Sequence, residues 1–225
     1  MKVSAPRLVD GLLLLVAAVW GSTYLAAKEL ITPSTVIAVL ALRFGVTVVV
    51  MVPFVVRRLR RTRRAELATG MMLGGILATI FLFETYGIAH TSATNAGLII
   101  SLTMIMTPLL ESVVSRSWLP PQFFAAAFMS VIGVALLASG QGMRAPALGD
   151  WLILLAAAIR AVHVIVMHKR SAGRDYDTVN LTFLQMATTA AVFGLAAPLT
   201  GESVATLVEQ FGPTQWANLL YLLAG

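Results

Sequence analysis

Residues 36–56 read VIAVLALRFGVTVVVMVPFVV, an apolar run in which Arg43 is the only charged residue. A helix needs about 20 mainly apolar residues to cross a bilayer. Strands of a membrane β-barrel are about 10 residues long and alternate strictly between apolar and polar side chains. This run is longer and apolar throughout, so it predicts a membrane-spanning helix.

Further apolar runs flank this one along the whole chain. The composition agrees, since 58% of the 225 residues are hydrophobic and 12% are charged, whereas soluble domains average about 45–50% and about 25%. These values exclude a disordered chain, a coiled coil and an ordinary soluble enzyme. We expect an all-α polytopic membrane protein with seven full spans and a truncated eighth, which begins at Trp216 and stops at Gly225. The other six full spans are Gly11–Ala27, Leu67–Ala89, Ala93–Val114, Phe123–Ser139, Trp151–Met167 and Val179–Leu199.

Basic residues are distributed unevenly between the two sides of the membrane. Twelve of the 16 Lys and Arg residues fall on the same side as the N-terminus, whereas Lys28 and Arg144 fall on the other. The positive-inside rule therefore predicts a bacterial-type inner (plasma) membrane protein with a cytoplasmic N-terminus. The first run, preceded by Lys2 and Arg7, would also suit a signal peptide, but six later spans favour a retained helix.

The cluster Arg57–Arg64 contributes six of these twelve residues. Basic clusters bind nucleic acid in some proteins, but this one lies between two apolar runs. We interpret it as a topology anchor that also contacts anionic lipid, and we expect no nucleic-acid partner.

An internal repeat starts at Asp10, where DGLLLLVAAV aligns with DWLILLAAAI at residues 150–159. The same frame places Trp20 over Arg160, and the next span places Arg43 over Gln185. Five spans separate the two starts, so the second copy must enter the membrane from the opposite side. Such an inverted repeat is typical of secondary transporters, which hold substrate between the repeats near the midplane. We predict a first repeat over residues 1–141 with helices 1–5, and an incomplete second repeat over 142–225 with helices 6–8.

Three motifs follow one another along the chain: LVAAVWGSTYLAAK at residues 15–28, Leu42-Arg43-Phe44 in the second span, and YGIAHTSATNAGLIIS at 86–101 with Pro108 beyond it. In this order they resemble the EamA-type transporters of the drug/metabolite transporter superfamily. The resemblance implies ten helices in two inverted five-helix repeats, and export of amino acids and other small metabolites. That pattern needs further helices after Leu223, so we expect this chain to be a fragment of a longer protein.

Ionisable residues inside spans are costly in hydrocarbon and are therefore the first candidates for a substrate cavity. Arg160 lies at the middle of the sixth span, and we predict that it faces the cavity and binds a substrate anion. The alternative is a packing arginine paired with a carboxylate. Arg43 is expected to form a structural ion pair with Glu84. The alternative is that this pair is a gate or a coupling site, in which Glu84 would bind a coupling proton. His163, one turn from Arg160, either relays protons or forms a packing hydrogen bond.

Neutral polar and aromatic residues complete the candidate set. Trp20 and Tyr24 share one stripe of the first helix and suit an amphipathic solute, although helix packing explains them equally well. Asn95 and Gln185 are further cavity candidates, although most such residues simply form hydrogen bonds between helices. Gly70 and Gly74 have small-xxx-small spacing, which predicts close helix packing within one chain rather than dimerisation.

The sequence contains no P-loop, nucleophile elbow, HExxH motif or cysteine, and its histidines lack carboxylates at metal-ligand spacing. We therefore expect no catalytic residue, cofactor or metal site, and a protein that is not an enzyme. The hypothesis is a secondary active transporter that exports small metabolites such as amino acids by alternating access. The alternatives are an intramembrane enzyme acting on lipid-borne substrates and a membrane scaffold without transport. The sequence indicates neither the coupling ion nor the oligomeric state.

Overall fold

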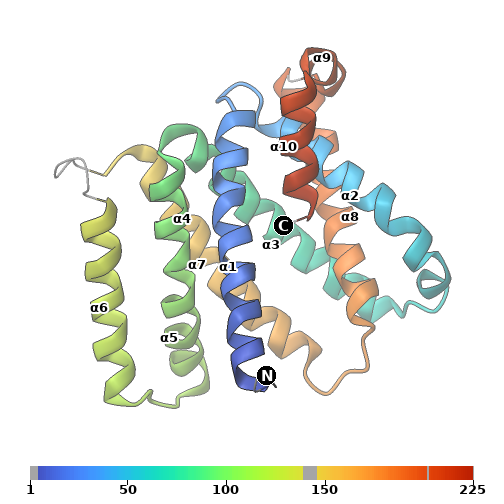
Figure 1. The fold of residues 1–225 in the computed structure, drawn as a ribbon. Helices are drawn as coiled ribbons and strands as arrows, with labels where there is room; N and C mark the ends of the chain where they lie inside the picture. The colour runs from blue at the N-terminus through green and yellow to red at the C-terminus, as the bar shows by residue number, and fades with distance from the viewer. Residues whose placement is uncertain (1–4, 139–145, 202, 225) are drawn as a thin grey trace.

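A computed structural model describes residues 5–138, 146–201 and 203–224, which form helices joined by turns (Figure 1). The predicted domain boundary at residues 141–142 and the basic residues Lys2 and Arg144 lie outside the described residues. The helices are α1 (Ala5–Leu30), α2 (Val36–Leu59), α3 (Arg64–His90), α4 (Ala93–Ser101), α5 (Thr103–Ser115), α6 (Pro121–Ala138), α7 (Leu148–Ser171), α8 (Thr178–Thr200), α9 (Val204–Gln210) and α10 (Pro213–Ala224).

Five helical segments among the described residues are long and apolar enough to cross a membrane, which confirms an all-helical polytopic membrane fold. They are α2, α3, α4 with α5, α7 and α8. The apolar part of α6, Pro121–Leu137, is shorter, whereas α1 covers the first predicted span and α10 the beginning of the eighth. By length and composition, five of the seven predicted full spans are therefore supported, and the count of seven stays a prediction.

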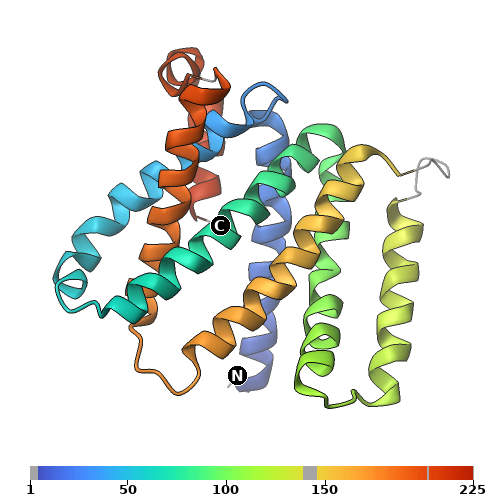
Figure 2. The same ribbon diagram turned by 180° about the vertical axis from the view of Figure 1, so that it is seen from behind.

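The long helix α3 lies between α7 and α8, as seen from both sides in Figures 1 and 2. Helix α2 packs on α8, α4 and α5 pack on α7, and α10 packs on α1. In Figure 1, α1 and α7 run in opposite directions, as is required when the two repeats start five spans apart. The two-fold relation between the predicted repeats stays a prediction.

Glycines allow α3 to approach both of its neighbours closely. A Cβ atom on Gly70 would lie 2.5 Å from the Cβ of Leu184, and one on Gly74 would lie 2.6 Å from the Cβ of Thr188. Further along α3, a Cβ on Gly87 would lie 2.6 Å from Cδ1 of Ile153. The predicted close packing at Gly70 and Gly74 within one chain is thus confirmed, because both residues face α8.

Hydrogen bonds fix α1, α3 and α7 together at one end of the bundle. Lys28, in the last turn of α1, donates to the carbonyls of Ile88 at 2.7 Å and Ala89 at 3.0 Å. A cation stabilises these carbonyls because they lie at the negative end of α3. Thr91, just beyond α3, donates to the carboxylate of Asp150 in the first turn of α7 at 2.5 Å.

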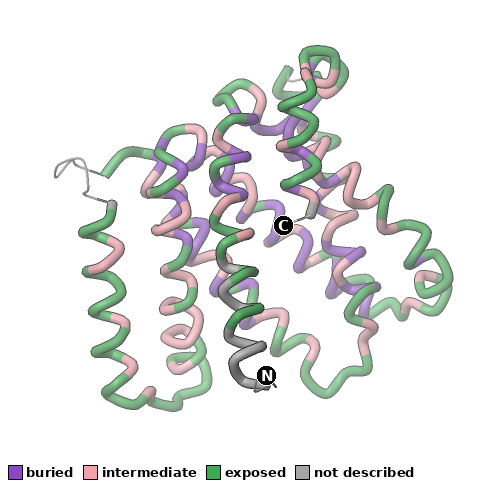
Figure 3. Tube along the Cα trace, viewed as in Figure 1, coloured by how far each residue is buried: buried purple, intermediate pink, exposed green. Residues whose placement is uncertain are grey.

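Burial is concentrated where α3 meets its neighbours, whereas α6 has no buried residue among those described (Figure 3). The core includes Tyr24 of α1, Leu40 and Phe44 of α2, Ile80 of α3 and Ile153 of α7. The middle of the bundle is therefore a place where several spans meet, and the cavity described next lies there.

Candidate functional site

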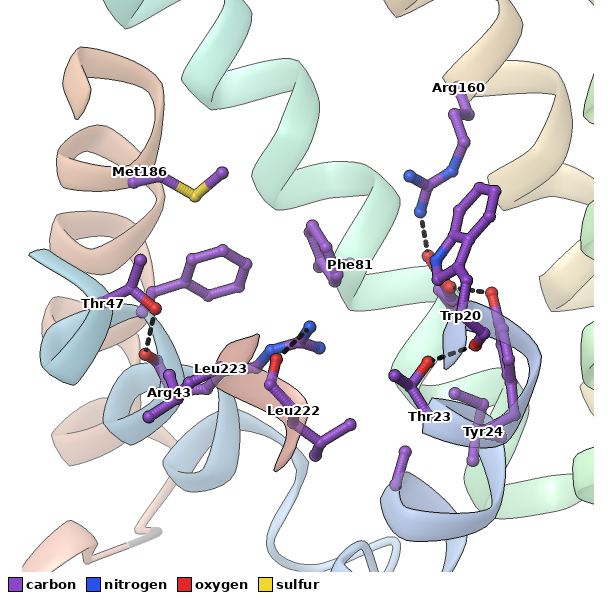
Figure 4. Close-up of a pocket in the computed structure, with 14 residues that line it drawn as sticks. Trp20, Thr23, Tyr24, Arg43, Thr47, Phe81, Arg160, Met186, Leu222 and Leu223 are labelled. Carbon is purple, nitrogen blue, oxygen red and sulfur yellow. Dashed lines mark hydrogen bonds and ion pairs between the residues drawn. The ribbon is translucent and has the colours of Figure 1, made fainter. Parts of the chain in front are cut away.

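A cavity of about 380 Å³ lies among α1, α2, α3, α7, α8 and α10 (Figure 4). Its walls combine aromatic rings with ionisable groups. The lining residues are Trp20, Thr23, Tyr24, Ala27, Arg43, Phe44, Thr47, Phe81, Glu84, Ile88, Arg160, Met186, Leu222 and Leu223. Five of the eight sequence-predicted site residues are thus brought together: Trp20, Tyr24, Arg43, Glu84 and Arg160.

Glu84 contacts two other polar side chains of this cavity, those of Arg160 and Tyr24. Its side chain is buried on α3, 8% exposed, and forms an ion pair with Nη2 of Arg160 on α7. Its other carboxylate oxygen accepts a hydrogen bond of 2.5 Å from the hydroxyl of Tyr24 on α1. The carboxylate therefore links three spans, and its buried charge is compensated by a cation and a neutral donor.

Arg160 lines the cavity and is also paired with a carboxylate. It therefore has the position expected of a cavity residue and the partner expected of a packing arginine. Its side chain is 18% exposed, and its guanidinium carbon lies 5.6 Å from the centroid of the Phe81 ring. Its Nε atom is buried and has no hydrogen-bond partner among the described residues. Binding of a substrate anion by Arg160 stays a prediction.

The expected pair between Arg43 and Glu84 is wrong. Arg43 instead donates from Nη2 to the carbonyl oxygen of Leu222 in α10, at 3.0 Å. Its guanidinium carbon lies 5.2 Å from the ring centroid of Phe81 and 5.9 Å from that of Phe44. Arg160 and Tyr24 contact the two oxygens of Glu84 instead. Among the described residues, no carboxylate forms an ion pair with Arg43.

Three predicted site residues lie outside the lining of this cavity. Nε2 of His163 lies 3.0 Å from Oε1 of Gln185, and both side chains are buried between α7 and α8. This contact matches the packing hydrogen bond that was the alternative for His163. Asn95 lies in the first turn of α4, where its backbone N–H donates to the hydroxyl of Ser92 at 3.1 Å.

Several lining residues were not singled out from the sequence. Phe81 precedes Glu84 by three residues on α3, so the shared helix face would have been enough to find it. Met186 and Leu222 gave no such signal, because each is an apolar residue within an apolar run. They line the cavity only because α8 and α10 pack around it.

The cavity is closed at the end near the turns that follow α1 and α9. Apolar residues fill this end, and all are buried: Leu30, Val36, Ile37, Leu40, Leu219 and Leu222. Two hydrogen bonds also join α1 to α10 here, from Asn218 to Glu29 at 2.9 Å and between the hydroxyls of Ser22 and Tyr221 at 2.5 Å.

A second cavity, of about 520 Å³, lies at the opposite end of α2 and α3. The arginines Arg57, Arg58, Arg61 and Arg63 line it, together with Glu66, Asp175, Asp177 and Asn180. Arg58 forms an ion pair with Asp177. This hydrogen bond from Arg58, together with the backbone N–H groups of Asn180 and Val179, lowers the pKa of Asp177.

Comparison with known proteins adds to this description. The EamA-like transporter family matches residues 7–139 of the chain. A protein of Archaeoglobus fulgidus described as an uncharacterized transporter is 25% identical over 186 residues, which is 83% of this chain. The chain spans 56% of the length of that relative. Residues of α1, α2 and α3 that line the cavity lie within the matched family region, whereas Arg160, Met186 and Leu222 lie beyond it.

Proposed function

Because the chain belongs to the EamA-like transporter family, we propose that it works as a secondary active transporter whose substrate site is the cavity around Glu84. The observation that carries the proposal is the cavity itself. It has a volume of about 380 Å³, within the usual range for small-molecule sites, and it lies between spans of both predicted repeats. We propose small metabolites such as amino acids as substrates, and export as the direction.

Alternating access around this cavity is supported by its asymmetry. Ionisable groups line its wall, whereas buried apolar side chains pack at one end. Apolar packing and a few hydrogen bonds close that end between α1, α2 and α10. No ion pair among the described residues joins α10 to α1 or α2, and opening of this end would break the hydrogen bond from Arg43 to Leu222. We propose that α10 moves with the second repeat when this end opens.

The orientation proposed for this transporter puts the N-terminus and the Arg57–Arg64 loop in the cytoplasm of a bacterial-type inner membrane. The arginines of the cluster that stand free of an acidic partner among the described residues are exposed. Exposed arginines next to a span attract anionic lipid headgroups, by roughly 1 kcal/mol each. We therefore keep anionic lipid as the proposed partner of this loop.

The test is uptake of labelled amino acids into proteoliposomes that contain the purified protein. Met186→Trp should reduce flux at least about tenfold, because an indole ring there would fill the cavity. Met129→Trp is the matched control, since Met129 is 67% exposed on α6 and far from the cavity lining. Equal flux through the two variants, or flux equal to that of protein-free liposomes for the parent protein, would refute the proposal.

A further inference from the structure

We infer that the cavity binds its solutes through a carboxylate group, and that Arg43 is the residue that receives this carboxylate. The inference deepens the transport function proposed above and rests on it. It also reverses the roles that the sequence gave to two arginines, because Arg160 was the predicted anion ligand and Arg43 the predicted structural partner of Glu84.

The charges of the cavity do not balance. Its lining residues include two guanidinium groups, on Arg43 and Arg160, and one carboxylate, on Glu84. That carboxylate forms its ion pair with Arg160, and Arg43 forms no ion pair among the described residues, so the lining carries one positive charge in excess. A buried cation in excess is costly in hydrocarbon and is by default a candidate site for an anion. A solute with one negative charge would make the cavity neutral.

The surroundings of Arg43 hold the guanidinium in place without neutralising it. One donor is directed to the carbonyl oxygen of Leu222 at 3.0 Å, and the rings of Phe81 and Phe44 lie 5.2 and 5.9 Å from its central carbon. A guanidinium has five N–H donors in a rigid fork. The remaining donors fit the two oxygens of a carboxylate, and this bidentate geometry is available to Arg but not to Lys.

Arg160 is a poorer anion ligand than Arg43. Its Nη2 is already bound to Glu84, and its Nε is buried, without a hydrogen-bond partner among the described residues. A second anion at Arg160 would lie next to Glu84 and be repelled by it. We assign to Arg160, Glu84 and Tyr24 the role of a fixed wall that links α7, α3 and α1.

Aromatic and sulfur-containing side chains provide the rest of the site. Trp20, Phe44, Phe81 and Met186 line the same cavity as Arg43. Figure 4 shows Met186 and Trp20 on opposite sides, with Phe81 between them. A solute with its carboxylate on Arg43 would therefore place an apolar body against these groups, so we expect monocarboxylates with a small aromatic or aliphatic body to bind.

The experiment measures binding rather than transport. Dissociation constants are determined by equilibrium dialysis on the detergent-purified protein, for acids and their neutral amides. The pairs are 3-phenylpropionate with 3-phenylpropionamide and butyrate with butyramide. We expect the acid to bind at least about tenfold more tightly than its amide, because a hydrogen-bonded charge is lost in the amide.

Variants then identify the residue. Arg43→Gln should weaken binding of the acids about tenfold or more and leave the amides unchanged, and Arg43→Lys should restore part of the loss. Arg60→Gln is the control, since Arg60 is exposed and lines neither cavity. The acid-to-amide comparison uses the unaltered protein, so it holds even if a variant folds poorly.

Three results would overturn the inference: amides that bind as well as acids, acids that bind Arg43→Gln as well as the parent protein, or no acid that binds at all. Cavity-dependent flux of neutral or cationic solutes, blocked by Met186→Trp, would leave the transport function in place and refute only the carboxylate site. Acid binding that depends on Arg43, without any flux, would leave the carboxylate site in place and refute only the transport function.

Discussion

The two halves of α3 each bury a glutamate, but the two carboxylates have different partners. Glu66, in the first turn, accepts a hydrogen bond of 2.8 Å from the amide of Asn180. Glu84, in the second half, requires the cation Arg160 as well as the hydroxyl of Tyr24. The positive end of a helix dipole stabilises an anion in the first turn, and this help is absent later in the helix. The helix dipole thus contributes to stabilising Glu66, in addition to the arginines that line the same cavity, whereas Glu84 depends on its ion pair with Arg160.

The same two halves differ in how they pack. The first half contacts α8 across Gly70 and Gly74, and the second half contacts α7 across Gly87. At Gly74 the nearest obstacles include the backbone oxygen of Gln185 at 2.8 Å, whereas at Gly87 they begin with the end of the Ile153 side chain at 2.6 Å. Backbone moves less easily than the end of a side chain, so the first half should tolerate change less well.

The largest expected effect comes from removing the carboxylate of the second half. Glu84→Gln leaves the part-buried Arg160 without its counterion, which should cost about 3–5 kcal/mol of unfolding free energy. Glu66→Gln should cost clearly less, because no cation depends on that carboxylate for burial. Unfolding in mixed detergent micelles measures both. The double variant Glu84→Gln, Arg160→Gln should recover most of the loss, and a double variant as unstable as the single one would contradict the assignment.

Next in size is the effect of adding a methyl group to the α3 glycines. Gly74→Ala should destabilise by about 1–3 kcal/mol, because the Cβ meets backbone and forces the helices apart. Gly87→Ala should cost less, since the end of the Ile153 side chain can turn away. Gly75→Ala is the control in open space and should be neutral or slightly stabilising through helix propensity. If Gly74→Ala and Gly75→Ala unfold at the same temperature, the close contact with α8 is refuted.

A smaller effect is expected from the amide that serves Glu66. Asn180 donates to Glu66 and to the hydroxyl of Thr62, each at 2.8 Å, but its own Oδ1 is buried without a partner among the described residues. Asn180→Ala should therefore cost about 1–2 kcal/mol, because the loss of a donor to the buried carboxylate of Glu66 is partly offset by removal of that oxygen. Thr182→Ala is the control, since Thr182 is half-buried on α8 and its hydroxyl donates to the carbonyl of Thr178 in the same helix at 2.9 Å. A loss as large as that of Glu84→Gln would remove the contrast between the two halves.

The smallest effect concerns pH at the beginning of α8. Asp177 accepts from Arg58 and from the N–H groups of Val179 and Asn180, and its pKa lies below the ordinary value of 3.8. A lowered pKa means that the stabilisation is complete above about pH 4 and is lost as the pH falls below it. The difference in unfolding temperature between the parent protein and Asp177→Asn should therefore be constant from pH 7 to 5 and shrink toward pH 3. A difference that grows on acidification would contradict this sign.

Much of the site could be predicted from residue type alone. Trp20, Tyr24, Arg43, Glu84 and Arg160 are polar or amphipathic residues inside apolar runs, and the cost of burying them makes such residues conspicuous. The same criterion also selected His163, Gln185 and Asn95, which lie outside the cavity lining. A polar residue in a span must find a partner, but its type does not say whether that partner is a solute or a neighbouring helix.

The sequence by itself determined where five of the spans lie, because hydropathy is a local property: Val36–Val56 falls within α2, and Val179–Leu199 within α8. Only the tertiary structure decided which arginine pairs with Glu84. Arg43 and Arg160 both lie at similar depth in their spans, and the choice between them depends on how α7 crosses α3 and on the position of Tyr24 beside the same carboxylate. Ion pairing depends on distances of a few ångströms between side chains far apart in the sequence, and no periodicity within one helix records those distances.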